Sequence, residues 1–424
     1  MRSLLVLIHR YVGLALAGFL VMAGLSGALL AFEHELDAAL NPGLMQVPPP
    51  TPGAAPMDPL ALREMVQARY PGAGVNRVDL ASRPGEALSF RLEWPPDTRA
   101  ENDQVFVNPY TGEILGARAW GDITHGVRNL VPFAYRLHQS LALDKTGAYA
   151  LGIVALLWTL DCFAGAYLTF PARRKMPLTP ALSPLAGRGR HTWLARWQPA
   201  WKVRWNGGSY KVNFDLHRAG GLWLWAMLIV LAWSAVAFNL REIYRPVMGL
   251  AFTFQPSPRD LPKAAGKQPG PGVGWLEARE TGRRLVAEEA RSRGFTVREE
   301  LNLSYDPSKA LYRYRVKSDR DVRDEGGSTS IWFDADSGKR RAFFLPTGAA
   351  GGDTVTTWLF ALHMAAVWGL PFKILIGVTG LVVAMLSVTG VVIWWRKRTA
   401  RRKSAPCSKV GQEGARRSIG YLLR

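Results

Sequence analysis

The distribution of apolar residues divides the chain into long apolar runs separated by polar stretches. The first run covers about 22 residues, which is too long for the apolar part of a secretory signal, and no small-residue cleavage site follows it. We therefore expect it to be a retained helix. Four runs are close to the roughly 20 residues that a helix needs to cross a bilayer: about Tyr11–Phe32, Ala148–Phe170, Gly220–Phe238 and Phe372–Trp395.

The polar stretches after the first and third runs have the pattern of mixed α+β domains. Apolar residues recur with helical spacing in Pro59–Tyr70 and Trp275–Gly294. Apolar and polar residues then alternate in Ala87–Leu92 and Leu311–Val316, which is typical of strands. A hairpin signal with a glycine follows in each stretch, since glycine accepts the left-handed turn conformation.

The chain also repeats itself. Both odd-numbered runs open with the motif H-R-x-x-G-L, at His9 and at His217. His138 and His363 precede the even-numbered runs, and each is followed by a glycine 27 positions later and then by a basic cluster. These matches predict two copies of one unit, which consists of a helix, an outer domain and a second helix.

The predicted fold class is therefore an α-helical membrane protein with four transmembrane helices, two small α+β domains outside the membrane and an internal two-fold repeat. The predicted segments are transmembrane helix 1 (1–36), outer domain 1 (37–130), a pre-helix with transmembrane helix 2 (131–171), a basic cytoplasmic loop (172–212), transmembrane helix 3 (213–241), outer domain 2 (242–352), a pre-helix with transmembrane helix 4 (353–395) and a basic cytoplasmic tail (396–424).

The positive charge lies in three segments. The formal net charge is +20. Residues 1–10, 171–212 and 396–424 carry 2, 9 and 10 Lys or Arg, with Glu413 as their one acid, so the rest of the chain is balanced. Four spans place all three segments on one side, the bias of cytoplasmic loops, and we expect both termini in the cytoplasm. We expect no nucleic-acid partner, because no nucleic-acid motif accompanies the charge.

Four of the seven histidines form two matched pairs. His9 and His217 begin spans that rise from the same side, so they lie at equal depth. Two imidazoles facing each other across a helix bundle are typical of a six-coordinate haem site. His138 and His363 are matched in the same way from the outer side. A break follows each of them, so this second site is expected on short helices that precede the spans.

Two further residues are candidates for a functional role. His34 closes the first span, 25 residues after His9 or roughly 37 Å along a helix, so the two cannot share one iron. It is an alternative outer ligand. Asp161 lies inside the second span, where a carboxylate needs a partner or a role. Proton handling, a quinol contact and a structural hydrogen bond all remain open for it. For His125 and His191 we expect surface or loop roles.

The chain resembles the PepSY-associated transmembrane family. The resemblance rests on the residues named above and on the order and spacing of these short motifs, and it covers nearly the whole chain apart from the tail and the linker Pro177–Arg190. It lies in the following matches: His9-Arg10 with Gly13-Leu14, Leu137-His138, His217-Arg218 with Gly221-Leu222, Leu362-His363, Thr389-Gly390, Thr111-Gly112 and Ser337-Gly338. The chain departs from the pattern at Ala164-Gly165, where Thr-Gly is usual.

The resemblance implies a bacterial inner-membrane protein linked to iron uptake, with PepSY-like periplasmic domains. Some members are ferric-siderophore reductases with two b-type haems. Haem b would then be held by the two histidine pairs, and electrons from a quinol or a cytoplasmic reductase would reduce a ferric siderophore or another ferric chelate. The iron would be released, because the hard oxygen donors of siderophores suit Fe(II) less well.

Two alternatives stay open. The outer domains could bind a protein or peptide, which would make the chain a non-enzymatic membrane sensor or regulator, but that leaves the four paired histidines unexplained. The chain could also be a haem subunit that passes electrons to another periplasmic partner.

Overall fold

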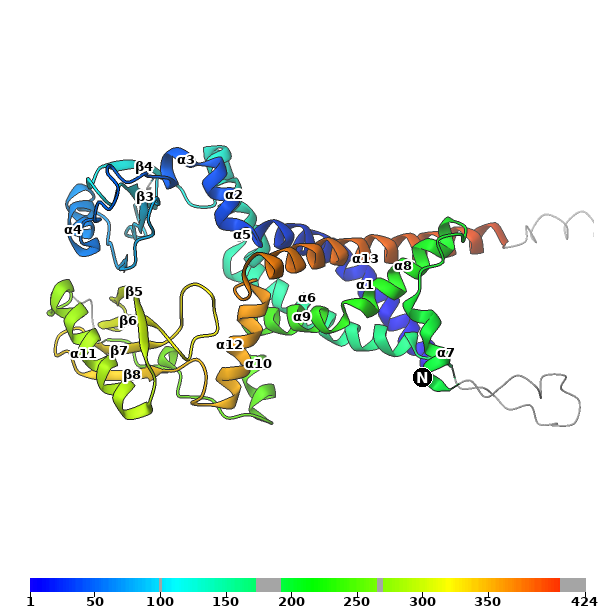
Figure 1. Ribbon diagram of the computed structural model, residues 1–424. Helices are drawn as coiled ribbons and strands as arrows, with labels where there is room; N and C mark the ends of the chain where they lie inside the picture. Colours follow the sequence, from blue (N-terminus) through cyan, green and yellow to red (C-terminus); the bar gives the residue numbers. More distant parts are fainter. Residues whose placement is uncertain (99–100, 173–191, 265–269, 405–424) are drawn as a thin grey trace, which may run out of the picture. The chain divides into compact units, whose positions relative to one another are not determined.

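The computed structural model describes residues 1–98, 101–172, 192–264 and 270–404 (Figure 1). The linker Pro177–Arg190 and His191 lie outside the described residues. Short turns of 3₁₀ helix connect several of the α-helices. The helices are α1 (Arg2–Leu30), α2 (Glu33–Leu40), α3 (Pro42–Met45), α4 (Pro59–Arg69), α5 (Leu130–Ser140), α6 (Asp144–Thr169), α7 (Trp193–Trp197), α8 (Ser209–Trp223), α9 (Trp225–Asn239), α10 (Arg241–Gly249), α11 (Trp275–Arg293), α12 (Gly351–His363) and α13 (Gly369–Ser404).

Three helices, α1, α6 and α13, are long and apolar enough to cross a membrane. The third predicted span is a helix pair, α8 and α9, which together pass the same test but are bent by 69°. The break falls at Leu224, one turn after the adjacent Gly220 and Gly221, and glycine pairs are a common cause of sharp helix kinks. The protein is thus a helical membrane protein with three or four candidate spans, as predicted.

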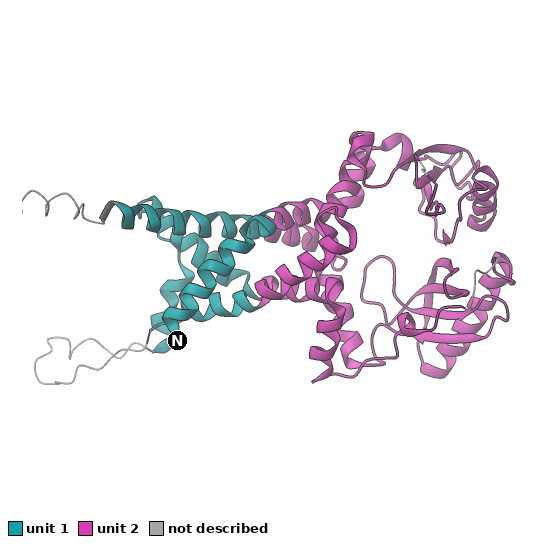
Figure 2. Cartoon of the chain, turned by 180° about the vertical axis from the view of Figure 1, so that it is seen from behind, with its two compact units in different colours: residues 1–21, 160–225, 382–424 teal, residues 22–159, 226–381 magenta. Residues whose placement is uncertain are grey.

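The chain divides into two compact units (Figure 2). The first unit holds residues 1–21, 160–225 and 382–424, and so contains the start of α1, the end of α6, α7, α8 and the end of α13. The second unit holds residues 22–159 and 226–381, which include every strand of the described chain. Each of the two histidine pairs predicted from the sequence lies within one unit.

Two antiparallel sheets form the β-structure of the second unit, which confirms two small β-sheet domains. Helix α4 precedes the first four strands and α11 precedes the last four, as predicted. Gly294 follows α11 as its C-cap residue, with a φ of 65°. The strands are β1 (Arg77–Asp79), β2 (Leu88–Arg91), β3 (Gln104–Val107), β4 (Ile114–Arg118), β5 (Val297–Asp306), β6 (Leu311–Ser318), β7 (Ser330–Asp334) and β8 (Arg340–Phe344).

Strand β1 joins the two sheets, which the sequence did not predict. Strand β1 is not part of the three-stranded sheet β2-β3-β4. It pairs with β5, so the larger sheet has the order β1-β5-β6-β7-β8. Val78 of β1 lies opposite Leu303 of β5. Just before β1, Gly74 exchanges two backbone hydrogen bonds with Glu93, which follows β2. Both sheets contribute to one hydrophobic core, with Phe90 from the first and Phe333 from the second.

A break precedes each even-numbered span, as the sequence predicted. Between α5 and α6, Leu141 and Ala142 have φ values of 54° and 56°. Between α12 and α13, Ala365 and Trp368 have φ values of 50° and 59°. Left-handed non-glycine residues store strain on the order of 1 kcal/mol each and cluster at functional sites. Here they end the two short helices that carry His138 and His363.

Candidate functional site

The first histidine pair lies in the first unit. His9 of α1 and His217 of α8 have ring centroids 6.1 Å apart, with the rings tilted by 55°. The Nδ1 atom of His9 lies 3.0 Å from Oδ1 of Asp161 on α6. The Nδ1 atom of His217 lies 3.0 Å from the carbonyl oxygen of Leu386 and 3.1 Å from Oγ1 of Thr389, both on α13. Four helices therefore fix the two rings.

The second pair lies in the second unit. His138 of α5 and His363 of α12 have ring centroids 6.2 Å apart, at 66°. The Nδ1 atom of His138 lies 2.9 Å from Oγ of Ser26, and that of His363 lies 2.6 Å from Oγ of Ser234. Phe238 adds an aromatic edge contact to His363 at 5.3 Å. His138 and His363, which precede the second and fourth spans, are thus each held by a serine of the first or the third span.

The hydrogen bonds fix the tautomer of all four rings. Asp161 and the Leu386 carbonyl only accept, so Nδ1 of His9 and of His217 donates to them. The hydroxyls of Ser26 and Ser234 already donate to the backbone carbonyls four residues earlier, at 2.7 and 2.6 Å. They therefore accept from their histidines. Every Nδ1 carries the proton, and every Nε2 keeps the lone pair that a metal binds.

Burial keeps the second pair neutral. Burial lowers the pKa of the His138 ring, and burial together with the neighbouring His138 lowers the pKa of His363 to about 3. Both rings are therefore uncharged at neutral pH, and neutral imidazole is the form that coordinates metals.

The hydrogen-bond partner of the histidine that opens the first or the third span, His9 or His217, differs between the two copies. Thr389 lies 26 positions after His363, and the equivalent position in the first copy is Ala164. In the first copy the hydroxyl is therefore missing, and Asp161 supplies the acceptor instead. The position equivalent to Asp161 is Leu386, which contributes its backbone carbonyl. Asp161 thus makes a specific hydrogen bond to His9, the third of the roles that its sequence position left open.

Glycines lie against three of the four rings. A Cβ atom on Gly165 would stand 3.1 Å from Cε1 of His9, and one on Gly390 would stand 3.2 Å from Cε1 of His217. A Cβ on Gly27 would stand 3.1 Å from Cε1 of His138. Gly165 and Gly390 are the glycines that end the 27-residue spacing of the repeat, so this spacing places a residue without a side chain beside each ring of the first pair.

The geometry of both pairs fits one iron between two imidazoles. A metal–nitrogen bond of about 2 Å, with about 1 Å more to each ring centroid, places the centroids of two opposite imidazoles about 6 Å apart. Both measured separations agree with this value. Among the described residues, no three His, Cys, Asp or Glu side chains group as metal ligands. Each pair could supply two imidazole nitrogens to a six-coordinate haem iron.

The remaining sequence candidates lie elsewhere. His34 is on α2, its side chain is 46% exposed, and its Nε2 lies 3.1 Å from Oε1 of Glu86. His125 faces Asp122 at 3.3 Å on the surface. The structure therefore brings His138 to His363, whereas His34 contacts a carboxylate.

Sequence reasoning missed the two serines. Ser26 follows His9 by 17 positions, and Ser234 follows His217 by the same 17 positions. Serine inside an apolar run is a weak signal by itself, because its hydroxyl often bonds the preceding turn of its own helix. The equal spacing within the repeat was the signal that would have identified both.

Comparison with known proteins gives a single family. A family model described as the PepSY-associated TM region matches residues 6–397. A search of the curated proteins finds no match. The matched stretch contains all four paired histidines, together with Ser26, Asp161, Ser234 and Thr389.

Proposed function

The chain belongs to the PepSY-associated TM region family, and on this premise we propose that it is a haem b protein that moves electrons across a membrane to reduce a ferric chelate. One observation carries the proposal. Two separate pairs of histidines each hold their rings at the separation of two axial ligands, 6.1 and 6.2 Å between centroids.

Each residue of the two sites has a distinct role in the proposal. His9 and His217 would hold an inner haem, and His138 and His363 would hold an outer haem. Haem bound at these sites would supply one-electron redox chemistry. Asp161, Thr389, Ser26 and Ser234 keep the proton on Nδ1 and fix the ring orientation, which leaves Nε2 available.

The direction of transfer follows from the charge pattern. The basic segments favour cytoplasmic termini, in a bacterial inner membrane, with the sheet domains on the periplasmic side. Electrons then enter from a quinol or a cytoplasmic reductase and leave to Fe(III) of a siderophore or another ferric chelate. One electron per iron converts Fe(III) to Fe(II), which hard oxygen donors hold less tightly, so the iron is released.

Purification from haem-replete cells tests the proposal. The purified protein should show a b-type Soret band that shifts on reduction. The pyridine haemochromogen assay should give about two haems per chain, one for each histidine pair. The reduced protein should be reoxidised by a ferric chelate, with Fe(II) trapped by a chelator of ferrous iron. A colourless protein without iron would contradict both the haem and the reductase, and a non-enzymatic membrane regulator would then be the better account.

A further inference from the structure

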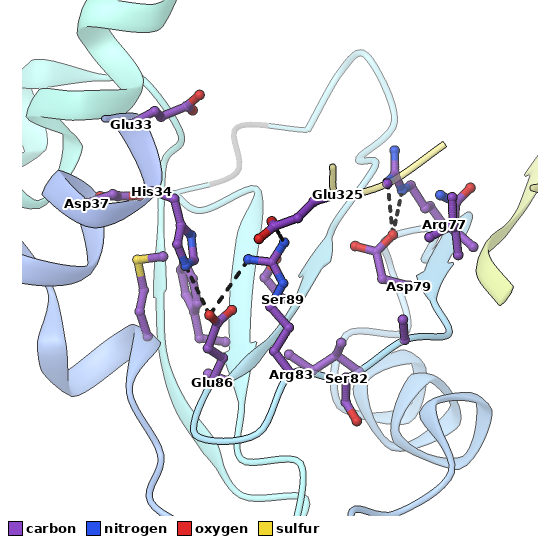
Figure 3. A pocket seen from close by; sticks show the side chains of 18 of the residues that line it. Glu33, His34, Asp37, Arg77, Asp79, Ser82, Arg83, Glu86, Ser89 and Glu325 are labelled. Carbon is purple, nitrogen blue, oxygen red and sulfur yellow. Dashed lines mark hydrogen bonds and ion pairs between the residues drawn. The ribbon is translucent and has the colours of Figure 1, made fainter. Parts of the chain in front are cut away.

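A cavity of about 930 Å³ lies in the second unit, outside the predicted spans (Figure 3). Its wall includes α2, the segment 81–89, strands β1, β5 and β6, and the loop 323–327. Its volume is within the range of about 300–1,000 Å³ that small-molecule sites occupy. None of the paired histidines lines it.

Most acidic groups of the cavity already have a cationic partner. Figure 3 shows that Glu86 takes contacts from both His34 and Arg83, and that Asp79 pairs with Arg77. The lining ion pairs are Arg77–Asp79 at 2.9 Å, Arg118–Asp37 at 2.8 Å, Arg83–Glu86 at 3.7 Å and Arg83–Glu325. Three further acids of the wall, Glu33, Glu299 and Asp324, make no ion pair among the described residues, and Asp324 accepts from the Gly369 N–H at 2.7 Å.

Two arginines of the wall have no carboxylate partner. Within the part of the chain that the structure describes, Arg315 makes no ion pair, and its buried Nε has no hydrogen-bond partner. Arg323 directs Nη2 to the sulfur of Met364 at 2.9 Å. Burial, with Arg77 and Arg323 nearby, lowers the pKa of Arg315 to about 10. Both guanidinium groups nevertheless stay charged at neutral pH. Asp79 and Asp321 lie near Arg315, and Asp321 lies near Arg323, but neither arginine forms an ion pair with them.

The sheet explains why a charged side chain lies there. Residues of β6 alternate between two faces, and Tyr314 packs in the hydrophobic core against Gly282 of α11. Arg315 and Lys317 therefore point to the opposite face, where the cavity lies. A half-buried, unpaired guanidinium is costly unless a ligand pairs with it.

We propose that this cavity binds a carboxylate-bearing ferric chelate, whose anionic oxygens pair with the guanidinium groups of Arg315 and Arg323. Guanidinium groups bind carboxylates through two parallel hydrogen bonds, which gives both strength and orientation. The proposal rests on the proposed function, because it names the substrate class of that reductase. It favours anionic chelates over neutral hydroxamate complexes, which have no carboxylate for these two groups.

Binding of a redox-inert analogue tests the proposal without electron transfer. Ga(III) citrate should bind the full-length protein in detergent, measured by calorimetry. Replacing Arg315 by Gln should weaken binding about tenfold, which is the loss expected for one charge-assisted hydrogen-bonded pair. Replacing Arg323 by Gln, in a loop where the fold depends less on it, should have a similar effect. Arg284→Gln on the exposed side of α11 is the matched control and should leave the affinity unchanged.

Several outcomes overturn the proposal. Equal affinity of the wild type, Arg315→Gln and Arg323→Gln for Ga(III) citrate would exclude the two arginines as the site. A Ga(III) tris-hydroxamate that binds as tightly as Ga(III) citrate would exclude the charge preference, and free citrate that binds as tightly as its complex would exclude a chelate site. Because gallium binding requires no haem, a colourless protein that still binds Ga(III) citrate would refute the reductase and not the anion site.

Discussion

At the scale of single residues, the hydrogen-bond partners of the Nδ1 atoms distinguish the two histidines of the first pair, His9 and His217. His9 donates to a carboxylate, whereas His217 donates to a carbonyl and a hydroxyl. A carboxylate raises the basicity of the imidazole that it accepts from. A more basic imidazole ligand stabilises ferric over ferrous iron, so Asp161 would lower the potential of the proposed inner haem.

Replacing Asp161 by Asn should therefore raise the midpoint potential of one haem and leave the other unchanged. We expect a shift of several tens of millivolts, since a tenfold change in relative affinity corresponds to about 59 mV for one electron. Redox titration followed at the Soret band measures it. Adding Ala164→Thr to this variant restores the partner that Thr389 provides in the second copy, and should return part of the shift. An unchanged potential would show that Asp161 does not act through His9.

The glycines beside the rings give a second prediction at this scale. Gly165→Ala introduces a Cβ atom that would stand 3.1 Å from the His9 ring. The ring must then move, and the inner site should lose most of its haem while the outer site keeps its own. Gly18→Ala is the control on the same bundle, since nothing lies within 4 Å of that Cβ. Full haem content in Gly165→Ala, counted by pyridine extraction, would contradict the close packing.

At the scale of elements, much of the architecture could be predicted from the sequence, but strand β1, which joins the two sheets, could not. The helices α4 and α11 and the strands β2 and β6 appear where periodicity placed them, because each buries one face in a common core. Strand β1 has three residues, too few to show alternation. Its partner, β5, lies more than 200 positions away, and such a pairing leaves no local trace in the sequence.

The site was predicted only in part for a similar reason. The histidines were identified because they belong to repeated motifs. The serines that hold two of them were not, because a serine in an apolar helix has many local hydrogen-bond partners. Gly13 and Gly220 lie in the repeated motif, yet they pack near Asp161 and Met385, and Gly165 and Gly390 are the glycines next to the rings. Only the tertiary contacts distinguish these cases.

An acidic group between two elements gives a prediction on stability. Glu300 of β5 accepts from Arg279 and Arg283 of α11 and from Tyr314 of β6, at 2.5–2.7 Å. Burial raises its pKa, but these hydrogen bonds outweigh burial and hold the pKa at about 2. The pKa of Glu300 in the folded protein is therefore below the ordinary glutamate value of 4.5. The contribution of ionised Glu300 to the free energy of unfolding is therefore complete above about pH 4.5 and is lost as the pH falls toward 2.

Glu300→Gln should destabilise the larger sheet by about 2 kcal/mol at neutral pH, because the partly buried Arg279 and the more exposed Arg283 lose their charged acceptor. It should also reduce the pH dependence of stability between about 4.5 and 2, while Asp334, whose pKa is likewise lowered to about 2, keeps its own contribution. Thermal unfolding followed by near-ultraviolet circular dichroism measures both effects. The control is Glu280→Gln, whose exposed carboxylate contacts the same Arg283 and should contribute less than about 1 kcal/mol. Equal effects of the two variants would contradict the central role of Glu300.

At the scale of the whole molecule, a two-fold repeat is combined with an asymmetric distribution of charge along the chain. The repeat supplies two histidine pairs and two sheet domains from one pattern. The charge asymmetry predicts the orientation of the chain in the membrane. A reporter fused after Arg424 or within Pro177–Arg190 should therefore be found in the cytoplasm, and one within Gln255–Gly274 in the periplasm. A periplasmic C-terminus would contradict the proposed direction of electron transfer.

In the proposed function, the two histidines of each pair share one iron. The haem content per chain of single and double histidine-to-alanine variants tests this sharing. His9→Ala and His217→Ala should each remove one haem, and the double variant should remove no more, because partners in one site are non-additive while distant sites add. His138→Ala and His363→Ala should behave in the same way, independently of the first pair. Two haems retained in His138→Ala, with one lost in His34→Ala, would contradict the second pair, and additive losses within either pair would contradict the claim as a whole.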